Sequence, residues 1–217
     1  MKQLIGIYGA SGFGREVLPL VREQYINAQI CFVDDGSNDS ELNGYPVYPY
    51  QDYLDLPSTN KAIVLAIADS RIREILDIKC RQNNLDILSV KADNSIALDK
   101  VELGDGSVLC HFTQLTSNIK IGKQFHANIY SYVAHDCVIG DYVTFAPKVQ
   151  CNGNVHIEDH AYIGTGAIIK QGTPKKPLVI GKGAIVGMGA VVTKSVAPGV
   201  TVIGNPARPL TKEGLRK

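Results

Sequence analysis

A six-residue period runs through the second half of the chain and limits what that half can fold into. Stepping by six from Ala97 to Ile169 meets thirteen residues, all of them apolar. In a chain that is 45% hydrophobic, chance would give such a run in roughly two of ten thousand cases. Hexapeptide repeats are typical of a parallel β-helix, in which three of them make one triangular coil. We therefore expect Leu103, Ile121 and Ile139 to stack in one internal ladder.

The period is interrupted once. The stretch "QGTPKKP" at 171–177 contains two prolines and two lysines, and the apolar period resumes after it with a one-residue shift. Proline and glycine clusters between periodic segments mark loops. This stretch therefore predicts a loop that extends from a corner of the β-helix.

The first half of the chain follows a different pattern. Residues 2–91 alternate short apolar runs with two segments of helical spacing, "GFGREVLPLVREQY" and "SRIREILDIKCRQN". Alternating strands and helices predict a parallel sheet, here with room for about four strands. We predict a small Rossmann-like α/β domain over residues 1–94, followed by the β-helix domain over 95–217 with a C-terminal tail.

The first predicted strand ends in "GASGFG", which fits G-x-x-G-x-G. Gly9, Ser11 and Gly12 in such a turn let the backbone approach a phosphate at the start of a helix. Asp34 and Asp35 end the second predicted strand, where folds of this kind contact a ribose. The alternative is a tight turn that needs glycine only for its geometry. The half is too short for a full dinucleotide site, which argues against a hydride-transfer enzyme.

Composition restricts the partners. The net charge of +1 gives no reason to expect a nucleic acid or a membrane. From Lys170 onward there are nine basic residues and a single acid, which suggests an anionic ligand or, for the last six residues, a solvated basic tail. Five cysteines without a CxxC, no signal peptide and no membrane-length apolar run predict a reduced, cytoplasmic protein.

His135 and Asp136 interrupt the apolar pattern. They lie between Val133 and Cys137, which the period turns inward, so they are expected at a corner and facing outward. Cys137 is then a buried core thiol. A carboxylate beside an imidazole can fix its tautomer and favour a general base. The alternative is an exposed surface histidine beside a solvated aspartate, and we expect the other four histidines to be of that ordinary kind. No two histidines are 18 or 36 residues apart, so no metal site is predicted.

The motifs resemble a known family. "NIYSYVAHDCVIGDYVTFAP", "IGKGAIVGMGAVVTKSV" and "VIGNPAR", together with "GIYGASGFGREV" and "FVDD" near the start, are similar to the hexapeptide-repeat sugar acyltransferases. The branch is that of the sialic acid O-acetyltransferases, which includes N-acetyltransferases for nucleotide-linked 4-amino-4,6-dideoxy sugars. The resemblance covers nearly the whole chain.

The resemblance implies a left-handed β-helix and a homotrimer with active sites between subunits. It implies acetyl-CoA as donor and direct transfer, with His135 as general base and Asp136 as its orienting carboxylate. The nucleotide sugar would bind the N-terminal domain through the glycine turn and the two aspartates described above. The residues that the resemblance assigns to CoA are Gly153, Thr165, Gly166, Gly187, Met188 and Ala190. Basic residues that suit its phosphates are Lys175, Lys176, Lys194 and Arg208.

Two positions depart from the family pattern. Some members have a second histidine nine residues after the base, where this chain has Thr144, and Ala68 stands where a glycine is expected. We predict N-acetylation of a UDP-linked 4-amino sugar in surface-glycan synthesis. The alternatives are O-acetylation of sialic acid or another surface sugar, a β-helix carbonic anhydrase, and a non-catalytic trimeric scaffold or sugar-nucleotide sensor.

Overall fold

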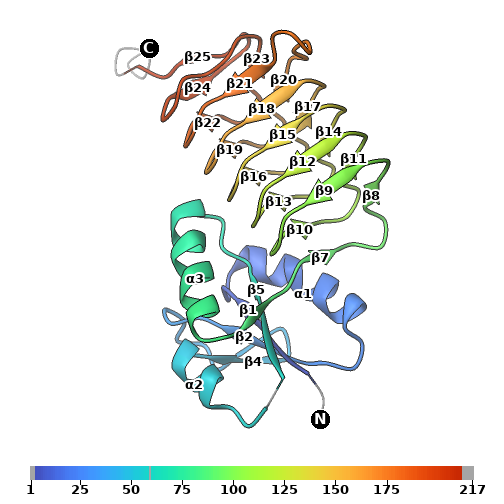
Figure 1. Ribbon diagram of the computed structural model, residues 1–217. Helices are drawn as coiled ribbons and strands as arrows, with labels where there is room; N and C mark the ends of the chain where they lie inside the picture. Colours follow the sequence, from blue (N-terminus) through green and yellow to red (C-terminus); the bar gives the residue numbers. More distant parts are fainter. Residues whose placement is uncertain (1–2, 59, 212–217) are drawn as a thin grey trace. The chain divides into compact units, whose positions relative to one another are not determined.

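The computed structural model describes residues 3–58 and 60–211, and the chain divides after Lys91 into two compact units (Figure 1). The last six residues of the predicted basic tail lie outside the described residues. The elements of the first unit, in chain order, are β1 (Leu4–Tyr8), α1 (Gly12–Gln24), β2 (Gln29–Val33), β3 (Glu41–Leu42), β4 (Tyr45–Tyr48), α2 (Tyr50–Asp55), β5 (Lys61–Leu65), α3 (Ser70–Gln82), β6 (Asp86–Ile87) and β7 (Val90–Lys91).

The first unit is a mainly parallel sheet in the order β3-β4-β2-β1-β5-β6, which confirms the Rossmann-like prediction. Strand β1 pairs in parallel with both β2 and β5, and all five of its residues are buried. This explains why it is an unbroken apolar run, since central parallel strands are covered on both faces.

The expectation of about four strands was wrong, because a short hairpin adds two more. Strands β3 and β4 pair antiparallel around Asn43 and Gly44, which both have positive φ (51° and 81°). Asn-Gly is the strongest short hairpin signal, because a type I′ turn needs positive φ at both central residues. Helix α2 was also missed, since six residues are too few for a clear helical period.

The second unit is a parallel β-helix with three faces, as predicted. The first face contains β10 (Val108–Leu109), β13 (His126–Ala127), β16 (Thr144–Phe145), β19 (Tyr162–Ile163), β22 (Ile185–Val186), β24 (Thr201–Ile203) and the antiparallel edge strand β25 (Arg208–Pro209). The second face contains β8 (Ile96–Ala97), β11 (Gln114–Leu115), β14 (Tyr132–Val133), β17 (Gln150–Cys151), β20 (Ile168–Ile169) and β23 (Val191–Val192). The third face contains β9 (Val101–Leu103), β12 (Ile119–Ile121), β15 (Val138–Ile139), β18 (Val155–Ile157) and β21 (Leu178–Ile180).

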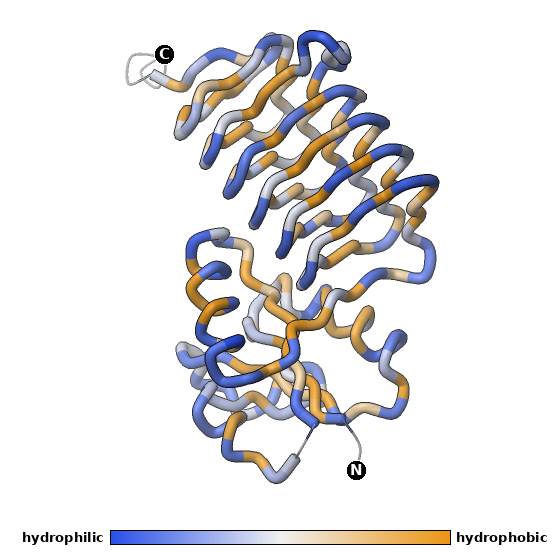
Figure 2. Tube along the Cα trace, in the orientation of Figure 1, coloured by the Kyte–Doolittle hydropathy of each residue, from blue (hydrophilic) through white to orange (hydrophobic). Residues whose placement is uncertain are grey.

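The predicted internal ladder is confirmed by the register of the third face. Leu103 pairs with Ile121, and Ile121 pairs with Ile139 in the next coil. Ile121 and Ile139 are 5% and 2% exposed, and Figure 2 shows hydrophobic segments recurring from coil to coil. Leu103 departs from the expected burial at 39% exposed, because β9 is the last strand of its sheet and no further coil covers it.

The corners of the coils share one backbone conformation. Positive φ recurs every six residues from 100 to 166, at Lys100, Gly106, Phe112, Asn118, Gln124, Tyr130, Asp136, Tyr142, Lys148, Asn154, His160 and Gly166. Such values are uncommon for residues other than glycine and cost roughly 1–2 kcal/mol each. The core must therefore hold these corners in place, and it does so with a continuous apolar cluster from Leu109 to Val202.

Lys148, which is exposed and has φ 61°, offers a test of this corner conformation. Backbone entropy alone would favour Lys148→Val over Lys148→Gly, but valine tolerates positive φ poorly. We expect Lys148→Gly to be about 1 kcal/mol more stable than Lys148→Val. Chemical denaturation at one fixed protein concentration checks this, and the reverse order would contradict the account.

Candidate active site

His135 and Asp136 are the two turn residues between the second and third faces. The backbone stacks this turn between its neighbours, because Asp136 N–H donates to Ser117 O and Asn154 N–H donates to His135 O, both at 3.0 Å. One coil further on, Gly172 N–H donates to Gly153 O at 2.9 Å. We call residues 117–118, 135–136, 153–154 and the loop 171–177 the His135 corner.

The two side chains form a pair on the surface of this corner. The His135 Nδ1 atom lies 2.8 Å from Asp136 Oδ2, and the side chains are 49% and 46% exposed. In a neutral imidazole this contact places the proton on Nδ1 and leaves the Nε2 lone pair available. No hydrogen bond reaches Nε2 from any residue in 3–58 or 60–211. The expected outward orientation is therefore correct, and the geometry suits proton acceptance at Nε2.

Gly153 lies directly against the imidazole ring. A Cβ atom added to Gly153 would lie 2.6 Å from His135 Cε1 and 2.7 Å from Nε2, and its three nearest neighbours all belong to this ring. Its N–H donates to no acceptor among the described residues. The absence of a side chain thus lets His135 pack on the next coil, beside an available backbone donor.

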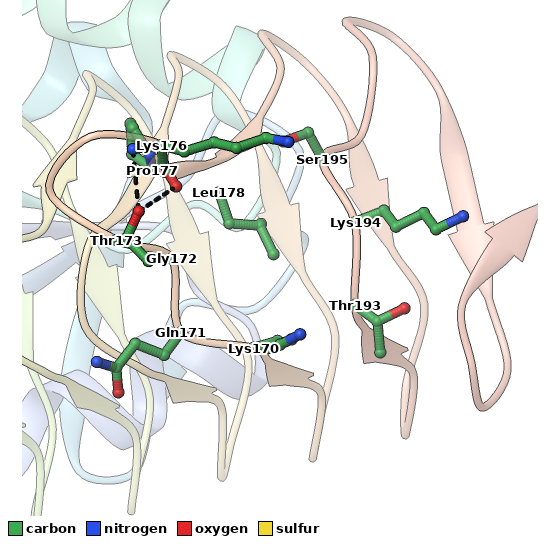
Figure 3. A pocket seen from close by; sticks show the side chains of 10 residues that line it. All are labelled: Lys170, Gln171, Gly172, Thr173, Lys176, Pro177, Leu178, Thr193, Lys194 and Ser195. Atoms are coloured by element: carbon green, nitrogen blue, oxygen red, sulfur yellow. Dashed lines mark hydrogen bonds between the residues drawn. The ribbon is translucent and has the colours of Figure 1, made fainter.

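A cavity of about 480 Å³ opens in the loop of the same corner (Figure 3). Lys170 and Lys176 line it from the start and the far side of the loop, and Lys194 lines it from the following coil. Thr173 closes the loop by exchanging backbone hydrogen bonds of 3.0 Å with Lys176. None of its ten lining residues is acidic. The predicted loop at 171–177 is confirmed, and the cavity suits an anion. Lys170, Thr193 and Ser195 were not predicted, because each is an ordinary polar residue in the sequence.

The residues that the resemblance assigned to CoA do not all lie together. Gly153 belongs to the His135 corner, whereas Thr165, Gly166 and Met188 lie at turns between the first and second faces, with Gly187 next to them. The Met188 side chain is 81% exposed.

Ala190 differs from the other residues assigned to CoA. It is fully buried, its N–H donates to Gly187 O, and its carbonyl accepts from Ile168 N–H. It packs the core, so the prediction that it contacts the donor does not fit the structure.

The predicted nucleotide turn follows β1. Gly9 has φ +113°, and a Cβ atom on Gly14 would lie 1.9 Å from Gly9 O, so both glycines are required by the close packing of the turn. Gly12 has open space, with only Arg15 at 3.9 Å. Ser11 is exposed at the N-cap of α1 and makes no side-chain capping bond. Two glycines are therefore structural, while Ser11 and Gly12 are accessible.

The two aspartates after β2 are hydrogen-bonded within the protein. Asp34 accepts from Ala10 N–H and Gly36 N–H, at 2.8 and 2.9 Å, and so fixes the glycine turn. Asp35 accepts from the Tyr8 hydroxyl at 2.7 Å and from Tyr50 N–H at 2.8 Å.

Asp35 also lies 3.6 Å from Lys79. Burial alone would raise the pKa of Asp35, but the hydrogen bonds and the Lys79 charge bring it below its usual value. Both aspartates thus shape this edge of the sheet, and their contact with a ribose stays a prediction.

Other predicted features differ in their surroundings. Cys137 is a buried thiol that donates to Asn152 O at 3.2 Å, as expected of a core residue.

His126 and His160 are 0% and 7% exposed, so the expectation that they are surface histidines was wrong. His160 stacks on Tyr142, with the ring centroids 5.2 Å apart.

The expected second histidine position belongs to another face. Thr144 is buried on the first face, away from the turn that carries His135. In the described part of the chain, no three His, Cys, Asp or Glu side chains gather as a metal site would require. No helix there has both the length and the apolar character to cross a membrane.

Comparisons with known proteins match both units. The PglD N-terminal domain family matches residues 4–78. The GDP-perosamine N-acetyltransferase of Escherichia coli O157:H7 is 47% identical over 214 residues, which cover 96% of this chain and 97% of that protein.

Two solved structures extend the likeness to the whole fold. WeeI from Acinetobacter baumannii AYE has a TM-score of 0.95 and 65% identity, covering 96% of this chain and all of that one. PerB from Caulobacter crescentus, in complex with CoA and GDP-perosamine, has a TM-score of 0.85 and 25% identity, covering 95% and 97%.

The packing of Gly153 against His135 predicts the effect of Gly153→Ala. The new methyl group cannot coexist with the ring position, so the imidazole should rotate and lose its 2.8 Å contact with Asp136. The ring is half-exposed and can move, so we expect stability to change by less than about 1 kcal/mol. A crystal structure of the variant checks the ring position. In a His135→Ala background the same change should be structurally silent. An unmoved imidazole would contradict the assignment.

Proposed function

This chain belongs to the hexapeptide-repeat acetyltransferases that act on nucleotide-linked sugars, and from that premise we propose that it transfers an acetyl group from acetyl-CoA to the amino group of a nucleotide-linked 4-amino-4,6-dideoxy sugar. The observation that carries the proposal is the His135–Asp136 pair with Gly153 against its ring. The E. coli relative is by its name an N-acetyltransferase, which favours transfer to nitrogen.

The proposed reaction is a direct transfer. The sugar nitrogen attacks the thioester carbonyl carbon, so that a C–N bond forms and the C–S bond breaks. His135 Nε2 accepts the proton that leaves the nitrogen, and this proton then goes to the departing CoA thiolate. The Gly153 N–H, which has no acceptor among the described residues and belongs to the residue beside the ring, would donate to the oxyanion. Asp136 holds the imidazole with its proton on Nδ1.

The donor would extend from His135 into the lysine-lined cavity of the same corner. CoA carries a pyrophosphate and a ribose phosphate, and the cavity offers three lysines without a carboxylate. PerB binds CoA in its crystal structure, which supports a CoA substrate here as well.

Two features support a homotrimer with active sites between subunits. First, Thr165, Gly166 and Met188 lie at a different turn from His135, so a second copy can bring them to the donor. Second, the second face and the turns beside it expose Ile96, Ile168 and the stacked rings of Phe112 and Tyr130, each 42–49% exposed. Phe112 and Tyr130 stack on each other with their ring centroids 4.8 Å apart, so these two rings form one exposed apolar patch, and such patches mark interaction surfaces.

The nucleotide would be recognised by the first unit. Ser11 and the open position at Gly12 stand at the start of α1, where backbone N–H groups favour a phosphate. The sequence prediction favours a UDP-linked sugar, whereas the names of the E. coli and Caulobacter proteins support a GDP-linked one. We therefore propose a nucleotide-linked amino sugar as the acceptor, and an assay with the UDP-linked and the GDP-linked sugar distinguishes the two nucleotides.

His135→Ala tests the proton acceptor. A positioned base contributes ~10²–10⁴-fold, so kcat should fall by at least ~10². Sedimentation should give the same trimer of the 23.5 kDa chain for the variant as for the native protein. Turnover close to that of the native protein would contradict the role of His135.

Lys194→Gln tests the anion site. Loss of one phosphate contact should raise the KM for acetyl-CoA about 3- to 10-fold and leave kcat unchanged. Acetyl-pantetheine lacks these phosphates, so its KM should not change. Lys123→Gln, at a turn between the third and first faces, is the matched control. Equal KM values for Lys194→Gln and the native protein would contradict the placement of the phosphates.

A further inference from the structure

We propose that Asn118 is a positioning residue for the reaction, acting through Asp136 on the His135 imidazole; this inference rests on the proposed function. The Asn118 Nδ2 atom donates to Asp136 Oδ1 at 3.3 Å. The other carboxylate oxygen, Oδ2, faces His135 Nδ1 at 2.8 Å. The three side chains therefore form a relay in which each oxygen of Asp136 has one partner.

The fold places Asn118 for this contact. Asn118 and Asp136 are 18 residues apart, so they occupy the same position in consecutive coils of the His135 corner. Both have left-handed backbone, with φ 56° and 59°, which asparagine and aspartate tolerate better than most residues. Asn118 N–H donates to Asp99 O at 3.1 Å, so the coil before it holds the backbone of Asn118 in turn.

A second anchor on the carboxylate has a physical purpose. The Asp136 side chain is 46% exposed, and a carboxylate held only by the imidazole can rotate into water. An amide that donates to the far oxygen restricts this rotation and keeps Oδ2 on Nδ1. Because the amide is neutral, it does so without a charge that would compete with the imidazole for Asp136. The consequence is a larger share of the tautomer whose Nε2 accepts a proton.

Asn118→Gly is the variant that isolates the amide. It removes the side chain but keeps a residue that adopts positive φ without strain. We expect kcat to fall about 3- to 10-fold, with KM unchanged for both substrates, because the contact serves the chemical step and not binding. Asn118→Asp has the same shape but places an anion against Asp136, so its loss should be larger.

The matched control is Lys100→Gly. Lys100 is exposed and occupies the same corner position one coil earlier, with φ 52°. Its replacement makes the same backbone change without removing a hydrogen bond to Asp136, so kcat should stay at the native value. In an Asp136→Ala background, Asn118→Gly should cause no further loss, because a residue acting through Asp136 has nothing left to position.

A readout independent of turnover completes the test. Nitrogen chemical shifts of ¹⁵N-histidine-labelled protein report the His135 tautomer, and Asn118→Gly should increase the form protonated on Nε2 while Lys100→Gly does not. An unchanged tautomer, or a kcat loss that persists in the Asp136→Ala background, would overturn the inference. If the tautomer shifts while His135→Ala retains native turnover, Asn118 still orients the pair but the proposed proton acceptor is wrong.

Discussion

Stacking of left-handed corners is the constraint on which the second unit depends. From Lys100 to Gly166 every sixth residue has positive φ, and most of these residues are not glycine. This conformation is costly for a single residue, but from Asn118 onward each corner residue donates its backbone N–H to a carbonyl of the preceding coil, as Asp136 and Asn154 illustrate. The apolar ladders inside, including the edge-to-face pair Phe125 and Phe145, bury enough surface to maintain it.

The same constraint creates the candidate site. The turn at residues 135–136 exposes both of its side chains, and the 18-residue coil sets each of them beside the equivalent positions of the neighbouring coils. His135 therefore lies against Gly153, and Asp136 lies within reach of Asn118. An insertion at the next coil makes the lysine-lined cavity on the same corner. Reactive groups, a backbone donor and an anion site are thus brought together by a repeat whose core residues have no chemical role.

The sequence predicts those parts of the fold that follow from periodicity. Ile121 and Ile139 stack as expected because an inward residue must be apolar in every coil. The left-handed backbone of the corners was not predicted, because aromatic residues such as Phe112 and Tyr130 have no intrinsic preference for positive φ, and the stacked coils impose it. The Asn43–Gly44 hairpin was predictable from its turn and was overlooked.

The site was predictable to a similar extent. The outward orientation of His135 follows from the period, and stepping back 18 residues from Asp136 would also have found Asn118. The lysines of the cavity could be foreseen only as a basic excess, since their convergence depends on the loop conformation. Ala190 was misassigned because a small residue in a familiar motif gives no sign of whether it faces a ligand or the core.

The most direct test of the account is acetyl transfer itself. Purified protein would be incubated with acetyl-CoA and, in separate reactions, a GDP-linked 4-amino-4,6-dideoxy sugar, its UDP-linked counterpart, and sialic acid. CoA release would be followed, and the product identified by mass and NMR spectroscopy. The account predicts turnover with a nucleotide-linked amino sugar and a product that carries the acetyl group on the sugar nitrogen. The nucleotide of the sugar that is turned over identifies the natural nucleotide. Acetylation of a sialic acid hydroxyl alone, or no CoA release in any arm, would contradict it.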